Sequence, residues 1–147
     1  MGGNTLTLAV KEKPKQRLLE QFASSHPQLV IDGSLEEQDH VVVRRKPGQV
    51  EESFHVWRPM RAFENNDLEP DLASIVPAPC WILQVVLESN PPSEDWELAN
   101  SLARFIATTC DGAVFYDELG KIVWPEGAQK KAKTPKKERT VDVATLE

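Results

Sequence analysis

The residues that could act as nucleophiles, bases or metal ligands are scattered along this chain. The three histidines fall in separate segments, at His26, His40 and His55, without HxH, HExxH or HxxE spacing. Ser24-Ser25 lacks the G-x-S-x-G elbow that exposes a nucleophilic serine. No glycine-rich phosphate-binding motif is present in the sequence. We therefore expect a protein that is not an enzyme and holds no cofactor or metal, with a small enzyme of dispersed site as an alternative.

The two cysteines, Cys80 and Cys110, lie 30 residues apart and belong to no CxxC pair. Their spacing favours two reduced, mostly buried thiols. A disulfide and a metal site are the alternatives.

Carboxylates gather in two short stretches. The acids concerned are Glu36, Glu37 and Asp39 in the first stretch, and Glu64, Asp67, Glu69 and Asp71 in the second. They form either solvated loops or a surface that binds a basic protein. A divalent metal site is a third interpretation, but neither stretch has the alternating acids and central glycine of an EF-hand loop.

Trp57 stands on the polar side of an alternating segment and is followed by Arg58. One interpretation is that this tryptophan packs under the long loop that follows. The other is that Trp57 and Arg58 anchor a protein interface, because exposed Trp and Arg are typical hot-spot residues. We count both residues among the candidate partner-binding residues.

Charge is unevenly spread along the 147 residues. Residues 128–147 hold six bases and three acids, a net of +3, while the whole chain carries −6, so residues 1–127 carry −9. An acidic body disfavours nucleic acid and acidic membranes as ligands and favours a basic protein partner. We expect a single domain over 1–127 and a basic flexible tail over 128–147. The basic run at 130–139 resembles a nucleic-acid-binding or localisation patch, and a solvated tail is the alternative.

Hydrophobic periodicity places the elements that must position these residues. Alternation or continuous apolar runs predict strands at 5–10, 29–31, 41–43, 50–56, 81–87, 113–116 and 122–124. Helical spacing predicts one helix after Pro14 that ends near Ser25, and a longer one that is capped by Ser93 and ended by Gly112 in a left-handed conformation. A Pro-Gly turn at 46–49 joins 41–43 to 50–56. Residues 59–79 are expected to form a long loop with one short helical turn at 67–75.

These elements predict an α+β fold. The pattern strand–helix–strand occurs twice, at 4–31 and 81–116, which is typical of a two-layer, mostly antiparallel sheet with two helices on one face. A ferredoxin-like fold or a relative of it is therefore expected.

Residues 80–126 carry a pattern that resembles a known group of proteins. A central strand and a long amphipathic helix are followed by the segments 111–117 (DGAVFYD) and 122–125 (IVWP). This arrangement is similar to small bacterial α+β proteins, some of which resemble immunity proteins encoded beside secreted toxins. The resemblance implies a toxin inhibitor and brings no functional residues with it.

The expected function is that of a protein-binding inhibitor. We expect an immunity protein that neutralises a basic, nuclease-type toxin, with carboxylates at positions that phosphates would take. A nucleic-acid-associated protein that uses the basic tail is the alternative. The N-terminus has no basic flank before an apolar core, and no apolar run is long enough to span a bilayer, so we expect a cytoplasmic protein without membrane contact.

Overall fold

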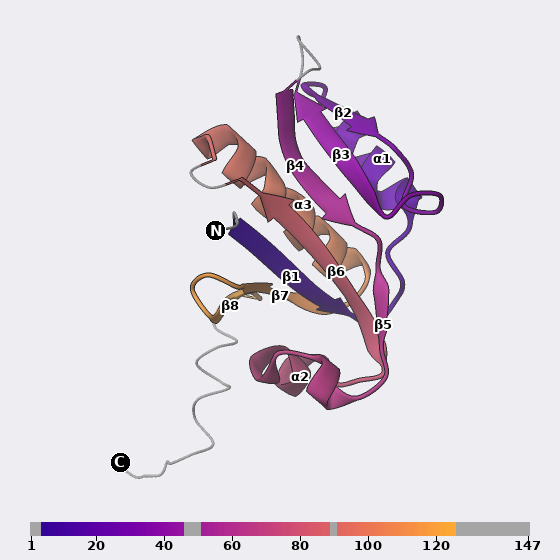
Figure 1. Ribbon diagram of the computed structural model, residues 1–147, viewed down its shortest axis with the longest axis vertical. Helices are drawn as coiled ribbons and strands as arrows, with labels where there is room; N and C mark the ends of the chain where they lie inside the picture. Colours follow the sequence, from indigo (N-terminus) through magenta and orange to yellow (C-terminus); the bar gives the residue numbers. More distant parts are fainter. Residues whose placement is uncertain (1–3, 46–50, 89–90, 126–147) are drawn as a thin grey trace.

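An antiparallel sheet with helices on both faces forms the body of the protein. The computed structural model describes residues 4–45, 51–88 and 91–125. The predicted turn at 46–49 and the basic tail at 128–147 lie outside the described residues. Figure 1 looks onto the sheet, with the two longer helices behind it and the short third helix below.

The elements follow the chain in the predicted order, with additions between residues 59 and 79. The strands are β1 (Asn4–Val10), β2 (Leu29–Asp32), β3 (His40–Arg45), β4 (Glu51–Trp57), β5 (Met60–Ala62), β6 (Cys80–Leu87), β7 (Gly112–Tyr116) and β8 (Lys121–Trp124). The helices are α1 (Gln16–Ser24), the 3₁₀ turn η1 (Asn65–Asp67), α2 (Pro70–Ile75) and α3 (Ser93–Thr109). The predicted α+β class is confirmed.

The strand order is β2-β3-β4-β6-β1-β7-β8, and β5 pairs with β6 as a continuation of β4. All these pairs are antiparallel. Both β6 and β7 pair with β1, so these two strands run parallel to each other with β1 between them. This is the split strand–helix–strand arrangement of ferredoxin-like folds. Here the β3–β4 hairpin is inserted between β6 and β2, which widens the sheet.

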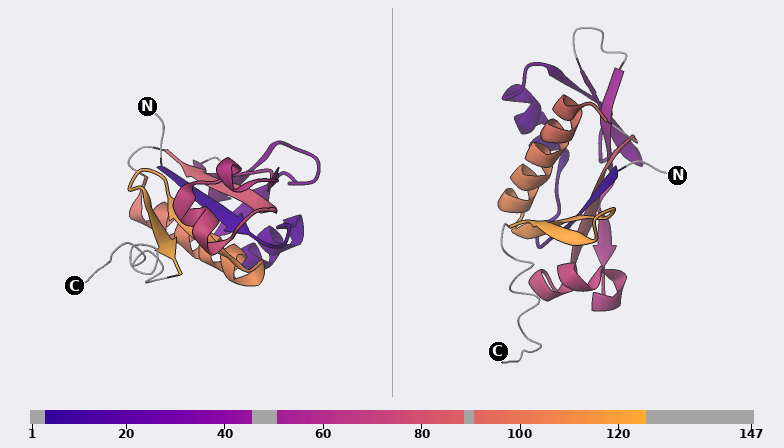
Figure 2. Two further views of the ribbon diagram at one scale, coloured as in Figure 1. Left: turned by 90° about the horizontal axis from the view of Figure 1, so that it is seen from below. Right: turned by 90° about the vertical axis from the view of Figure 1, so that its left-hand side faces the viewer.

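One face of the sheet carries the main core. Alternate residues of the strands, such as Leu6, Leu8 and Val10 on β1, point to this face and are fully buried. α1 contributes Leu18, Leu19 and Phe22 to the same cluster. α3 contributes Leu98, Leu102 and Ile106 at four-residue steps. The view in Figure 2 (right) shows both helices on this side of the sheet.

Within residues 4–45, 51–88 and 91–125, the other face is covered at one end only, by α2. Leu72 of α2 is fully buried and packs with Ala9, Ala113 and Phe115 from β1 and β7. α2 contacts β1, β7 and β8. The remainder of this face, over β3, β4 and β6, lies towards the viewer in Figure 1.

Residues 59–79 are more regular than a long loop. The predicted helical turn is present as α2, but β5 and η1 were not predicted. β5 adds to β6 through the pairs Met60↔Ile82 and Ala62↔Cys80. Pro59 separates it from β4, because proline has no N–H to continue the ladder. A three-residue strand with a proline before it has too short a pattern to be recognised in the sequence.

The ends of α3 differ from the prediction by one residue each. Pro92, not Ser93, is the N-cap, and no side chain caps this end. At the other end the left-handed residue is Asp111, with φ 63°, rather than Gly112. Gly112 is required for another reason: a Cβ there would lie 2.1 Å from the carbonyl oxygen of Ala9. Asp tolerates the left-handed region better than most residues, so the left-handed position after α3 comes one residue before the glycine.

No helix within the described ranges is both long enough and apolar enough to cross a membrane.

Candidate functional site

The half of the second sheet face that α2 leaves uncovered is the candidate site, and we call it the open face. It is lined by side chains that are half-buried or exposed on four neighbouring strands: Thr5, Thr7, His40, Val42, His55, Trp57, Gln84 and Val86. The strand registers place them in rows across the sheet, with His40 opposite Trp57, His55 opposite Val86 and Gln84 opposite Thr7. Gln84 Nε2 donates to Thr7 Oγ1 at 3.4 Å.

An aromatic stack stands at one side of the open face. The ring of His40 lies 5.0 Å from that of His55 and 4.8 Å from that of Trp57, measured between centroids. Trp57 alternates with the core residue Val56 and therefore points to the open face. It retains 41% of its surface exposed. Of the two interpretations from the sequence, packing under a loop does not describe this side chain.

Two further large apolar side chains are exposed beside Trp57 along the chain. Met60 is 58% exposed and Phe63 is 72% exposed. Met60 pairs with Ile82, which packs on the α2 side, so Met60 shares the face of Trp57. We call Trp57, Met60 and Phe63 the apolar strip. Exposed apolar side chains gathered over seven residues are typical of an interaction site rather than of scattered surface residues.

The four acids of residues 64–71 lie at η1 and at the beginning of α2. The Asp67 carboxylate accepts hydrogen bonds from the backbone N–H groups of Phe63 and Glu64, both at 3.1 Å. Glu64 accepts in return from the backbone of Asp67, which completes a capping box. Glu69 caps α2 by accepting from the Asp71 N–H at 2.7 Å. Three of these acids therefore have a local structural role as well as a charge.

The turn between β7 and β8 brings two further acids, Asp117 and Glu118, to the open face. They were not predicted from the sequence. Asp117 Oδ1 accepts from Thr7 Oγ1 at 2.8 Å, and Glu118 Oε1 accepts from the Thr5 N–H at 2.9 Å. Burial raises the pKa of Asp117, the Thr7 hydrogen bond lowers it, and the negative charges of Glu118 and Glu69 raise it. Glu69 of α2 thus lies close enough to Asp117 for its negative charge to raise the pKa of Asp117. Only the pairing of β7 with β1 brings these acids together, so no sequence signal marks them.

Arg58 and the first acidic stretch lie together beyond the aromatic stack. The Arg58 N–H donates to the carbonyl oxygen of Asp39 at 2.7 Å, which continues the pairing of β4 with β3. Its guanidinium Nε donates to the carbonyl oxygen of Leu35 at 3.3 Å. Glu36 and Glu37 are exposed in the same loop between β2 and β3. The predicted site residues therefore form two groups, one around Trp57 and one at α2, which β5 connects.

The prediction of two reduced, buried thiols is confirmed. Both are free and buried, Cys80 in β6 and Cys110 at the end of α3. Burial raises the pKa of each thiol; Arg61 lowers that of Cys80 and Glu12 raises that of Cys110 further. Thiols of this kind are poor nucleophiles at neutral pH. Across residues 4–45, 51–88 and 91–125, no group of three His, Cys, Asp or Glu side chains is placed to hold a metal ion.

The comparisons with known proteins add no family. No protein-family model, curated protein or solved structure matches this chain.

Proposed function

We propose that this chain is a protein-binding domain that recognises a basic protein through its open face. The observation that carries the proposal is the exposure of the apolar strip, of which Trp57 and Met60 lie on the open face, together with the carboxylates at α2 and the β7–β8 turn. Trp57 would be the anchor, because large aromatic side chains at the centre of an interface contribute most of the binding energy. Glu69, Asp71, Asp117 and Glu118 would form the rim on the side of α2 and the β7–β8 turn.

The two parts of this surface have different tasks. Charges at the rim act over about a Debye length, roughly 8 Å at physiological salt, and speed association with a partner of opposite charge. A desolvated tryptophan acts on dissociation, because its contacts must be broken before the partner leaves. The −9 charge of residues 1–127 adds a long-range attraction to the same partner.

In its specific form the proposal is a cytoplasmic inhibitor of the immunity-protein kind, without catalytic activity of its own. The resemblance of residues 80–126 to such proteins supports this form. A nuclease binds a polyanion, so a basic active cleft is a partner surface that fits an acidic rim. The inhibitor would then cover the cleft and place carboxylates where phosphates bind.

The experiment is capture on the immobilised chain, followed by binding kinetics with the purified captured protein. We expect a protein of high isoelectric point, and we expect Trp57→Ala to raise its dissociation rate at least about 30-fold, as a loss of 2 kcal/mol implies. A nuclease whose activity disappears when one equivalent of this chain is added would support the inhibitor form.

The matched control is Phe105→Ala, a half-buried aromatic residue of α3 on the opposite side of the sheet. This variant should leave the dissociation rate unchanged if it folds. Equal binding by the wild-type chain and Trp57→Ala would end the proposal for this face.

A further inference from the structure

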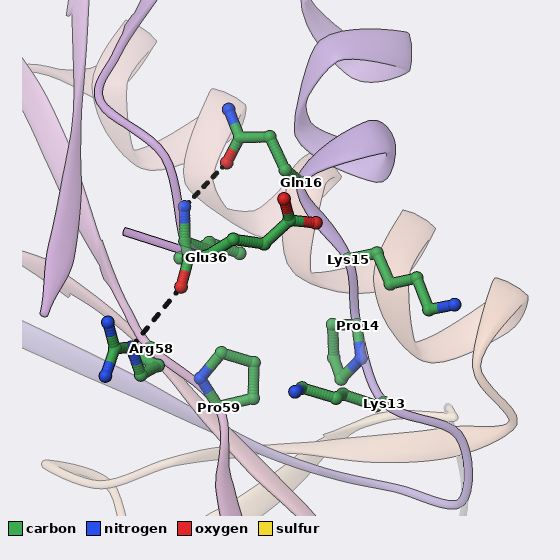
Figure 3. A pocket seen from close by; sticks show the side chains of 8 residues that line it. Lys13, Pro14, Lys15, Gln16, Glu36, Arg58 and Pro59 are labelled. Carbon is green, nitrogen blue, oxygen red and sulfur yellow. Dashed lines mark hydrogen bonds between the residues drawn. The ribbon is translucent and has the colours of Figure 1, made fainter. Parts of the chain in front are cut away.

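A cavity of about 400 Å³ lies apart from the open face, where three segments of the chain meet. Its walls come from the link before α1, the loop between β2 and β3, and the link between β4 and β5. The lining residues are Lys13, Pro14, Lys15, Gln16, Leu35, Glu36, Arg58 and Pro59. Figure 3 shows the side chains around the hollow.

Hydrogen bonds hold these walls in place. Gln16 Oε1 accepts from the Leu35 N–H at 2.8 Å, and Gln16 Nε2 donates to the carbonyl oxygen of Gly33 at 3.1 Å. On the other side of Leu35, Arg58 Nε donates to its carbonyl oxygen at 3.3 Å. The backbone of residue 35 is thus fixed between α1 and Arg58. A cavity built in this way exists before a ligand arrives, which lowers the cost of binding.

The charges that line the cavity are mostly positive. Three bases, Lys13, Lys15 and Arg58, and one acid, Glu36, are among the lining residues, so the lining carries two positive charges in excess. In Figure 3 the Lys13 ammonium points across the hollow towards Pro59, whereas Lys15 extends away from Arg58. This concentration of bases contrasts with the −9 charge of residues 1–127.

None of these three cations has a carboxylate partner within the part of the chain that the structure describes. Lys13 instead lies with its ammonium 5.1 Å from the centre of the Trp81 ring. The Nε–H group of Arg58 donates to the carbonyl oxygen of Leu35. The two terminal nitrogens of Arg58 make no hydrogen bond to a described residue. Lys13 and Arg58, with Lys15 further out at the mouth of the cavity, therefore have N–H donors that an anion could accept from.

We propose that this cavity binds a small molecule through a dianionic phosphate group. The excess of two positive charges matches a phosphate monoester, which carries nearly two negative charges at neutral pH. The fork of Arg58 suits two phosphate oxygens, and Lys13 supplies a point charge from another side. The rings of Pro14 and Pro59 offer apolar contact to the rest of the molecule. A volume of about 400 Å³ is in the range of small-molecule sites and too small for a macromolecule.

The test is an NMR titration of the full chain with inorganic phosphate, with sodium chloride at equal ionic strength as the reference. We expect saturable shifts at the lining residues, with a dissociation constant of about 1 mM or below. Glycerol 3-phosphate should bind at least as tightly, and acetate should bind at least about tenfold more weakly because it carries one charge. Acetate binding as tight as phosphate binding would overturn the assignment of a phosphate group.

Four variants distinguish this site from general attraction of anions. Arg58→Gln should weaken phosphate binding about tenfold, and Lys13→Gln about threefold, since each removes a charge-assisted contact. Glu36→Gln should tighten binding about threefold, a result that loss of folding cannot imitate. Lys121→Gln, on the edge strand β8, should have no effect. Binding that is unchanged in both Lys13→Gln and Arg58→Gln would refute the proposal, as would the lack of saturable shifts in the wild-type chain.

Discussion

Trp57 is the residue at which folding and binding can be separated. Its ring contacts that of His40, and 41% of its surface is exposed. Truncation to alanine removes this aromatic contact, which contributes about 1 kcal/mol, together with the covered part of the indole. We expect Trp57→Ala to lower the free energy of unfolding by about 2 kcal/mol or less, as measured by urea denaturation. A loss of several kcal/mol would show that this side chain belongs to the core.

Asp117 gives a pH-dependent prediction at the same scale. Because its pKa is raised in the folded protein, the folded state binds this proton more tightly than the unfolded state does. Its ionisation therefore lowers stability, and that loss is relieved as the pH falls through the raised pKa towards the unfolded value. Carbon-detected NMR titration should place the pKa of Asp117 above the ordinary value for aspartate. Glu69→Gln should bring it down, and a pKa unaffected by that change would mean that α2 lies further from the β7–β8 turn.

At the scale of elements, a buried ion pair attaches α3 to the β3–β4 hairpin. Asp95, in the first turn of α3, is 2% exposed. Its Oδ1 lies 2.8 Å from Arg45 Nε and accepts from Ser53 Oγ at 2.8 Å. The sequence indicated only an acid that favours the start of a helix, a role that needs no partner.

We expect Asp95→Ala to destabilise the protein by about 2 kcal/mol or more, because the change removes a buried carboxylate that contacts Arg45 and leaves the buried Ser53 hydroxyl without its acceptor. The neighbouring Glu94 is exposed, so Glu94→Ala should change stability by less than about 0.5 kcal/mol. Urea denaturation of the two variants measures the difference. Equal effects would mean that the ion pair contributes nothing beyond the charge of the first turn.

The junction of α3 and β7 yields a pair of opposite predictions. Gly112→Ala should destabilise by about 2 kcal/mol or more, because the new methyl group meets the backbone of Ala9 and Val10, which cannot move aside. Asp111→Gly should be neutral or stabilising by up to about 1 kcal/mol, since it relieves a positive φ. Thermal melts of both variants test the assignment. If Asp111→Gly destabilised the protein and Gly112→Ala did not, the assignment of Asp111 as the left-handed residue would be wrong.

For the whole molecule, the acids at η1 and α2 combine charge with capping, and amide substitution separates the two. Glu64→Gln, Asp67→Asn, Glu69→Gln and Asp71→Asn together keep an acceptor oxygen at each cap and remove the charge. We expect the urea midpoint to stay close to that of the wild type. Association with the basic partner should slow by about tenfold at low salt and converge with the wild-type rate at high salt.

The control for this variant neutralises four exposed acids elsewhere, namely Glu12, Glu20, Glu94 and Glu97. It changes net charge equally and leaves the open face intact, so association should slow less. Equal slowing by the two variants would assign the attraction to net charge alone and remove the rim of the open face from the proposal.

The sequence by itself determined the class of fold and most of its elements. Period-two alternation in β1 and the three- and four-residue steps of α3 reflect which face of each element is buried, a local property that the chain carries. The position of Trp57 on the polar side of its strand followed from the same alternation, whereas its exposure did not, because packing under the following loop was an open alternative. Net charge is a property of composition, so the sequence alone showed that residues 1–127 are acidic.

Only the tertiary structure decided which of these residues meet. The register of β7 on β1 brings Asp117 to Thr7 over 110 residues of chain, and the insertion of β3–β4 between β2 and β6 was not predictable from periodicity. The cavity at Lys13, Glu36 and Arg58 likewise needs three segments to converge. Contacts between distant segments depend on how buried faces pack together, and periodicity shows only that a face is buried, not what covers it.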